Sequence, residues 1–321
     1  MSSRFAIALG PDGKGHPADP AAACAHRADA AKLSWVHFDG REDETLHWLQ
    51  EHGGLPDTVA YALTAIETRP RCEQIGPGAL VNLRGPADDP DDGDPLVSIR
   101  LWLEKGRVIS VSYRRLADID LMREQMEAGT IQDPGDLVSR LAISITKRLD
   151  PVITGLGDLV DDCETSLRPE HAFDTRRKIA DTRSDAIVYR RFIVPEREAL
   201  QTLAALDVDW LEDDDRLHLR EAADRFARMA EELESVRERS ALIHEQLTDL
   251  RAELIDSRSL LISVVALVFL PLTFLTGLLG MNVDGIPFAH EPWAFAGVSA
   301  ICALIAVGVG AWFARQHWFG R

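Results

Sequence analysis

The chain has 321 residues, enough for two domains, and its 52 acidic and 35 basic residues give a formal net charge of −17. Such an acidic chain is not expected to bind nucleic acid, because phosphate binding depends on Lys and Arg. No CxxC pair is present, which predicts neither a disulfide framework nor a thiolate zinc site. The four cysteines are Cys24, Cys72, Cys163 and Cys302.

Residues 1–130 have the mixed pattern of a small α/β domain. Short runs of apolar and β-branched residues predict strands, and residues 104–107 between the last two predict a hairpin. Helices are expected over 43–51 and after Pro56. The start of the chain lacks the apolar stretch of a secretory signal, so we expect this domain in the cytoplasm. The predicted strands are 5–9, 33–38, 79–83, 96–103 and 108–113.

Residues 131–257 are predicted to be helical and to contain the start of a very long helix. Asp133-Pro134 is a typical helix start, and this first helix is expected to reach about residue 167 with a kink at Pro151. A second helix is expected over 173–193, before Pro195. From about 216 to 279 neither Pro nor Gly occurs before Pro271, which predicts a single helix on the order of 90 Å long.

Two apolar stretches near the C-terminus, 258–280 and 293–314, are long enough to span a membrane, which takes about 20 residues. No Lys or Arg occurs between 259 and 314. Basic residues flank the stretches at Arg258 and Arg315, so the positive-inside rule places both termini and the tail 315–321 in the cytoplasm. The loop 281–292 then faces outward, and the expected location is the inner membrane.

The long helix has two different faces. One face is apolar, with Ile243, Leu247, Leu250, Leu254, Leu261, Val265, Val268, Leu272, Leu275 and Leu279 at helical spacing. The opposite face is acidic and then small or hydroxylic, with Glu245, Asp249, Ala252, Asp256, Ser259, Ser263, Ala266, Leu270, Thr273 and Gly277.

This polar stripe predicts a pore-lining helix, and a water-filled path then requires several subunits around a common axis. Two other interpretations stay open. Small residues also promote close helix packing in lipid. Asp249 and Asp256 are also typical of a solvent-exposed helix face.

Several motifs resemble those of the CorA/ZntB-like divalent-cation transporters. Residues 269–277, FLPLTFLTG, are followed by Gly280-Met281-Asn282, and together they are similar to the family's first-span signature. Arg190-Arg191, residues 195–198 and the basic and aromatic tail 315–318 also resemble the family. The N-terminal α/β part is similar only in general plan.

The resemblance implies a funnel-shaped homopentamer in which an α+β cytoplasmic domain leads through a long helical stalk to two C-terminal transmembrane helices. The first span would line the pore. Asn282 would form an outer ring of amides that bind a hydrated ion, because dehydrating a small divalent cation is costly. Thr273 would add a hydroxyl ring, Pro271 a bend, Leu270 a constriction and Asp256 a carboxylate ring.

The flanks of the tripeptide bear on the transported ion. Leu279 and Val283 stand where the magnesium branch of the family usually has aromatic residues, and the loop 284–287, Asp-Gly-Ile-Pro, is similar to the ZntB branch. The resemblance therefore implies zinc as the substrate. A magnesium, cobalt or nickel channel of the CorA type is the alternative, and the sequence leaves the direction of transport and any coupling to protons open.

The outer loop carries a second candidate metal-binding group, Asp284, His290 and Glu291, which would concentrate incoming cations. No HxxxH or Cys/His cluster occurs elsewhere. Neither a nucleophile–base arrangement nor a cofactor motif is recognisable, so we predict neither an enzyme nor a cofactor. An interpretation of another class is a membrane-anchored oligomeric sensor or scaffold without transport.

Overall fold

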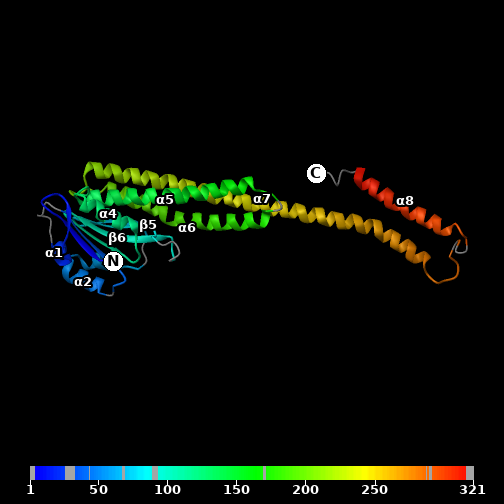
Figure 1. The fold of residues 1–321 in the computed structure, drawn as a ribbon, viewed down its shortest axis with the longest axis horizontal. Helices are drawn as coiled ribbons and strands as arrows, with labels where there is room; N and C mark the ends of the chain where they lie inside the picture. Colours follow the sequence, from blue (N-terminus) through cyan, green and yellow to red (C-terminus); the bar gives the residue numbers. More distant parts are fainter. Residues whose placement is uncertain are drawn as a thin grey trace. The chain divides into compact units, whose positions relative to one another are not determined.

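The computed structural model describes residues 4–25, 33–42, 44–66, 69–88, 93–168, 171–286, 288 and 291–315. These residues belong to two compact units, Met1–His244 and Glu245–Arg321. The first unit is an α+β unit built on one sheet, and the second contains the end of a long helix and a further apolar helix (Figure 1). This order of elements confirms the predicted α+β domain followed by a long helix and two apolar C-terminal segments.

The sheet of the first unit is mixed. Its order is β2-β1-β3-β7-β6-β5-β4, and only the central pair β3 and β7 is parallel. The hairpin between β6 and β7 turns at Gly106, whose φ of 72° is accessible to glycine without strain. The strands are β1 (Phe5–Leu9), β2 (Gly15–Pro17), β3 (Ser34–Asp39), β4 (Arg71–Ile75), β5 (Gly78–Pro86), β6 (Leu96–Glu104) and β7 (Arg107–Ser112).

Three short helices and three long ones cover opposite faces of the sheet. Figure 1 shows α1 (Pro20–Ala25) and α2 (Thr45–His52) on one side, with α4 (Ala117–Glu127), α5 (Pro134–Thr165) and α6 (Ala172–Ala204) on the other. Alternation along the strands sends side chains to both faces. The core on the side of the short helices contains Val36, Phe38 and Ile109 from the strands, with residues of α1, α2 and α3 (Asp57–Leu63).

A polar contact joins α6 to the sheet. The Arg84 backbone N–H on β5 donates to Glu196 Oε1 over 2.8 Å, and the Arg84 guanidinium lies 3.9 Å from the ring centroid of Phe192. Glu196 is fully buried, and this burial raises the pKa of its carboxyl to about 8. The contact anchors the C-terminal part of α6, next to Pro195, on β5.

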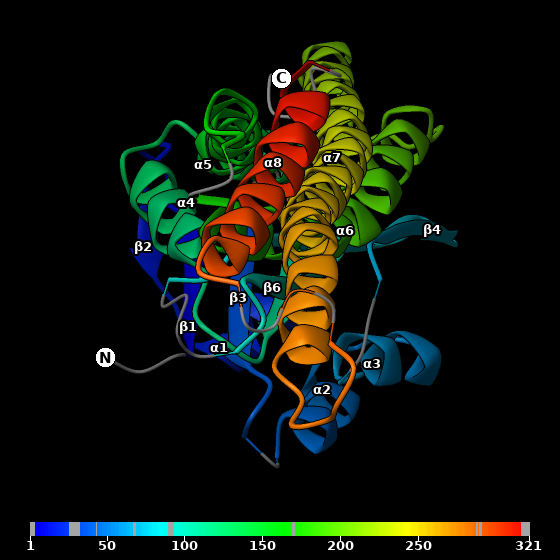
Figure 2. The same ribbon diagram turned by 90° about the vertical axis from the view of Figure 1, so that its right-hand side faces the viewer.

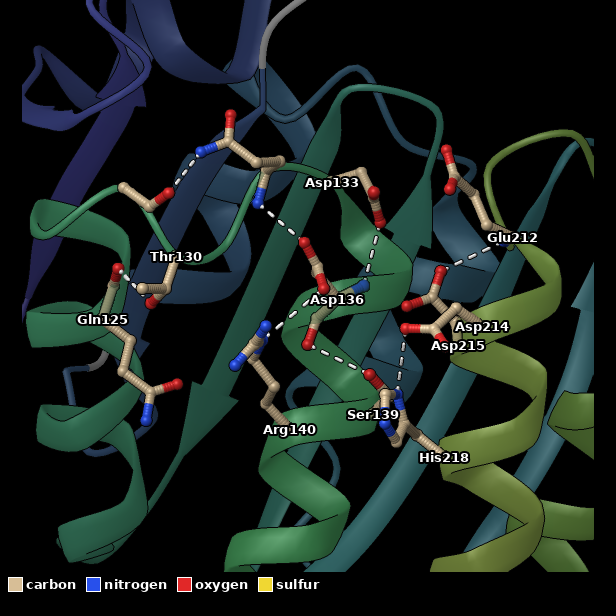
Figure 3. Close-up of polar contacts among 12 residues, drawn as sticks. Gln125, Thr130, Asp133, Asp136, Ser139, Arg140, Glu212, Asp214, Asp215 and His218 are labelled. Carbon is tan, nitrogen blue, oxygen red and sulfur yellow. Dashed lines mark hydrogen bonds and ion pairs between the residues drawn. The ribbon is translucent and has the colours of Figure 1, made fainter.

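The starts of α5 and α7 (Asp213–Leu279) lie together and are capped by their own carboxylates (Figure 3). Asp133 accepts a hydrogen bond of 2.8 Å from the Asp136 backbone N–H, and Pro134 occupies the first turn, as expected of a helix start. Asp215 accepts from the Glu212 N–H over 3.0 Å. Burial, and then the nearby Asp133, raise the pKa of Asp215 to about 6.

The predicted strands and helices occur, with differences at their ends. The strands β2 and β4 and the helix α1 were not predicted from the sequence. The expected end of the second helix before Pro195 was wrong, because α6 continues through Pro195 to Ala204. Packing outweighs the missing proline N–H there, since Ile193, Ala199 and Leu200 are buried on both sides of it. α5 likewise continues through Pro151 to Thr165, and the kink expected at Pro151 stays a prediction. The predicted domain boundaries also stay predictions.

Candidate ion pathway along helix α7

Two helices are long and apolar enough to cross a bilayer. They are α7, through its C-terminal part, and α8 (Ala294–Arg315), whose membrane-length segment is Ala294–Phe313. Only 6% of the apolar window of α7 and none of that of α8 is buried, so neither is the core helix of a soluble unit. An apolar helix of this length is stable in a lipid bilayer, because its backbone hydrogen bonds are satisfied within the helix and its apolar side chains contact lipid.

Exposure along α7 separates its faces. Within the second unit, half-buried positions recur at steps of three or four residues, at Val264, Val268, Leu272, Leu275 and Leu279. α8 turns back along α7 (Figure 1), and its own half-buried positions recur in the same way. Leu261 and Val265 were also expected on this apolar face, but they are 53% and 49% exposed. The half-buried face is therefore rotated slightly around the helix axis from the predicted apolar face.

The predicted polar stripe lies on the exposed side of α7. The positions stand roughly opposite the half-buried face at 100° per residue. The structure therefore brings these side chains into one line along one helix, facing away from the half-buried positions. All ten members are exposed: Glu245, Asp249, Ala252, Asp256, Ser259, Ser263, Ala266, Leu270, Thr273 and Gly277.

Hydroxyl groups on this stripe are tied to the helix backbone. Ser263 Oγ donates to the Ser259 carbonyl over 2.9 Å, and Thr273 Oγ1 donates to the Phe269 carbonyl over 2.7 Å. A hydroxyl that donates inward keeps oxygen lone pairs that accept hydrogen bonds from water. Thr276 makes the same bond to the Leu272 carbonyl over 2.9 Å, but it follows the half-buried Leu275 directly and lies to one side of the stripe.

Pro271 lies inside α7, and the helix continues past it to Leu279. Because proline lacks an N–H, it leaves one carbonyl of the preceding turn without its helical donor. Leu270, beside it, is 75% exposed. The bend at Pro271 and the constriction at Leu270 stay predictions.

The tripeptide Gly280-Met281-Asn282 follows the last residue of α7 directly. The Gly280 N–H still bonds to the Thr276 carbonyl over 2.9 Å, and a Cβ on Gly280 would lie 2.9 Å from that same oxygen. A residue with a side chain would therefore crowd the helix end. Met281 and Asn282 are exposed, just outside the helix, at the end of the polar stripe.

The acidic side chains of α7 and of the loop after it lie too far apart within one chain to bind a metal ion together. Asp249 and Asp256 stand two turns apart, about 10 Å along the helix axis. Asp284 and Glu291 are exposed in the loop, while His290 lies outside the described residues. Within the described part of the chain, no three His, Cys, Asp or Glu side chains gather in a way that could hold a metal ion.

Local contacts order the loop end that leads into α8. The rings of Phe288 and Trp293 lie 5.2 Å apart, and the Glu291 N–H bonds to the Phe288 carbonyl over 3.0 Å. Phe288 has a φ of 64°, an unusual value for a residue other than glycine. The loop therefore holds Glu291 within one turn of the start of α8.

A family profile described as "CorA-like Mg2+ transporter protein" matches residues 30–315, which include the strands β3 to β7, the long helix and both apolar segments. This chain belongs to the CorA-like family. The family consists of metal-ion transporters and not of enzymes, which confirms the prediction drawn from the Gly280–Asn282 signature.

Relatives and solved structures agree with this membership. A zinc transport protein ZntB from Yersinia enterocolitica is 31% identical over 293 residues, which cover 91% of this chain and 89% of that protein. The full-length CmaX protein is 28% identical with a TM-score of 0.79, and 99% of each chain is covered. The CorA magnesium transporter from Methanocaldococcus jannaschii has the same fold, with a TM-score of 0.80 over 99% of each chain at 16% identity.

Proposed function

We propose that this CorA-like chain transports divalent metal cations, zinc first among them, along the polar stripe of α7. The observation that carries the proposal is the continuous exposed stripe from Glu245 to Gly277, which ends at the exposed amide of Asn282. The choice of zinc rests on the 31% identity to a protein named for zinc transport. The magnesium, cobalt or nickel alternative has less support.

In the proposed assembly, five copies place their stripes around one axis in a funnel-shaped homopentamer of the inner membrane. Both termini lie in the cytoplasm, as the basic residues that flank the spans favour. Asn282 forms an outer ring of carboxamides, Thr273 a hydroxyl ring, Leu270 a constriction and Asp256 a carboxylate ring. The amide oxygens hydrogen-bond the water shell of the ion, so that the ion enters without complete dehydration.

Zinc uptake into proteoliposomes tests the role of Asn282. We expect Asn282→Ala to lower the initial rate at least about tenfold, because the ring of hydrogen-bonding oxygens at the pore entrance is lost. Val307→Ala, which shortens an exposed side chain on α8 away from the polar stripe and the tripeptide, is the matched control and keeps the wild-type rate. Equal zinc uptake by wild type and Asn282→Ala would refute this role.

The same assay separates the competing functions. Zinc transport predicts that excess magnesium leaves zinc uptake nearly unchanged, whereas a magnesium channel predicts strong competition. A sensor or scaffold predicts a stable oligomer without any flux. Uptake measured with and without a pH gradient then reports whether protons are coupled to the ion.

A further inference from the structure

A groove of about 320 Å³ lies between α6 and α7 within the first unit. Ile179 and Ile187 give it apolar walls, and Ile187 is 50% exposed. Ser240 also lines the groove. Its side chain is buried, and its Oγ makes no hydrogen bond within the described residues. The groove therefore lacks both an apolar cover and a hydrogen-bond partner, which a second molecule would supply.

Arg183 lines the same groove and adds a charge to it. Its side chain is exposed and forms no ion pair in the part of the chain that the structure describes. The residues three and four positions away on α6 are Ala180, Ala186, Ile179 and Ile187, so α6 itself offers no acid at ion-pair spacing. The molecule that fits this groove carries a carboxylate beside an apolar side chain.

The other side of α7 presents this combination. Leu242 is 58% exposed, and Glu238, one turn before it, is exposed and without an ion pair to any described residue. At about 100° per residue, Leu242 lies about 40° to one side of Glu238, whereas Ser240 lies about 160° to the other side. The leucine and the groove are on opposite flanks of the helix, so one chain cannot join them.

Contacts with the neighbouring helices fix these two flanks. On the side of the groove, Arg190 of α6 forms an ion pair of 2.8 Å with Glu234. On the side of Leu242, the Arg239 Nε–H donates to Glu164 of α5 over 2.9 Å. Figure 2 shows α5 and α6 on the two sides of α7. Each flank of α7 therefore has a different surface to offer to a neighbour.

Cyclic symmetry adds a condition on height. Copies related by rotation about one axis are not shifted along it, so a side chain on a helix along the axis meets the next copy close to its own level. Leu242 stands between Ser240 and His244 in the helix, level with the groove that these two residues line. Glu238 precedes Glu245 of the polar stripe by one heptad and shares its side of α7. Neighbours around the proposed axis then lie on the two flanks.

We propose that this groove holds Leu242 of a second copy of the chain, with Glu238 of that copy beside Arg183. The carboxylate supplies acceptors for the Arg183 guanidinium and for the Ser240 hydroxyl, and the leucine covers Ile187. Each copy uses its groove on one flank and its leucine on the other, so the contacts run head to tail and close into a ring. This contact rests on the proposed assembly and specifies how its neighbours meet.

Disulfide formation in native membranes tests the contact. In a variant without the native cysteines, Leu242→Cys is combined with Ser184→Cys, because Ser184 is exposed and lines the groove. We expect mild oxidation to link most chains into dimers and higher multiples on non-reducing gels. Both single variants should stay largely unlinked. Ala180→Cys, exposed in the same groove, provides a second pair with Leu242→Cys and the same expectation.

Leu217→Cys with Ser184→Cys is the matched control. Leu217 is 61% exposed and lies on the same side of α7 as Leu242, but on the order of 37 Å nearer the helix start. This pair should not link. Equal linking of the control pair and the Leu242 pairs would overturn the proposal, and so would the absence of linking in both Leu242 pairs.

Zinc uptake by the reduced double variant separates this contact from the proposed function. Uptake at the wild-type rate without linking would overturn the contact and leave transport standing. Linking without zinc uptake, in the double variant and in the wild type alike, would support the contact and contradict transport.

Discussion

At the scale of single residues, the fully buried Glu196 is the most unusual group of the first unit. Its Oε1 accepts the Arg84 N–H, while its Oε2 is buried without a hydrogen-bond partner among the described residues. Burial is the main cause of its raised pKa, and the hydrogen bond from Arg84 only partly offsets it. A carboxyl with a pKa of about 8 is mostly protonated at neutral pH, so α6 and β5 enclose a neutral group there.

We predict that Glu196→Gln becomes increasingly more stable than the wild type as the pH rises from 5 to 9. Between the ordinary value of 4.5 and about 8, folded wild type holds a proton that the unfolded chain releases, so rising pH removes stability from it. Gln does not titrate and keeps the acceptor for Arg84. Thermal unfolding should show a gain of at least about 1 kcal/mol, about 2–4 °C in Tm, at pH 9 over pH 5. A constant difference across this range would contradict a raised pKa.

At the scale of elements, capping fixes where the long helices begin. Asp133 and Asp215 each satisfy a backbone N–H that the helix itself leaves without a partner, and the two caps lie close together at the starts of α5 and α7 (Figure 3). The two helix starts approach closely at Gly135, where a Cβ would lie 2.1 Å from Asp215 Oδ2. A larger residue at this position would therefore displace the Asp215 side chain from its cap.

We predict that Asp133→Ala destabilises the first unit by about 1 kcal/mol, the usual cost of removing an N-cap. Asp150→Ala is the control: the same substitution at an exposed position in the middle of α5 should be neutral or slightly stabilising, because Ala favours the helix. Thermal unfolding of the full chain measures both variants. Equal effects would show that charge, and not the cap, is responsible.

At the scale of the whole molecule, the two units differ in how they bury their apolar side chains. The first buries its apolar side chains in its own core, as Trp35, Val36 and Phe226 show. The second leaves Leu270, Phe274 and Leu304 largely exposed, so it is complete only with lipid or other chains around it. The proposed pentamer assigns lipid to α8 and the common axis to the polar stripe of α7.

Cross-linking tests this assignment. In a variant without the four native cysteines, Thr273→Cys on the stripe should form linked subunits with a short bismaleimide in native membranes. Leu275→Cys, on the half-buried face of the same helix, should link poorly because it points away from the axis. Efficient linking through Leu275→Cys and none through Thr273→Cys would show that the half-buried face, and not the polar stripe, lies at the axis. This result would contradict the proposed pathway.

The sequence by itself determined the features that depend on local pattern. Alternating apolar residues indicated β1, β3, β5, β6 and β7, Asp133-Pro134 marked the start of α5, and charge-free stretches marked both apolar segments. The stripe of α7 was readable because helical periodicity and side-chain size are local properties. The family signature around Asn282 lies within one short segment for the same reason.

Only the tertiary structure decided the features that depend on residues distant in the chain. It buried Glu196 against β5 and carried α6 through Pro195, where packing outweighs the local cost of proline. It also brought Arg41 and Arg114 to one cavity, because they directly follow β3 and β7, which pair in parallel although they are distant in the chain. No periodicity in the sequence encodes that pairing, since it follows from how the whole sheet packs between its helices.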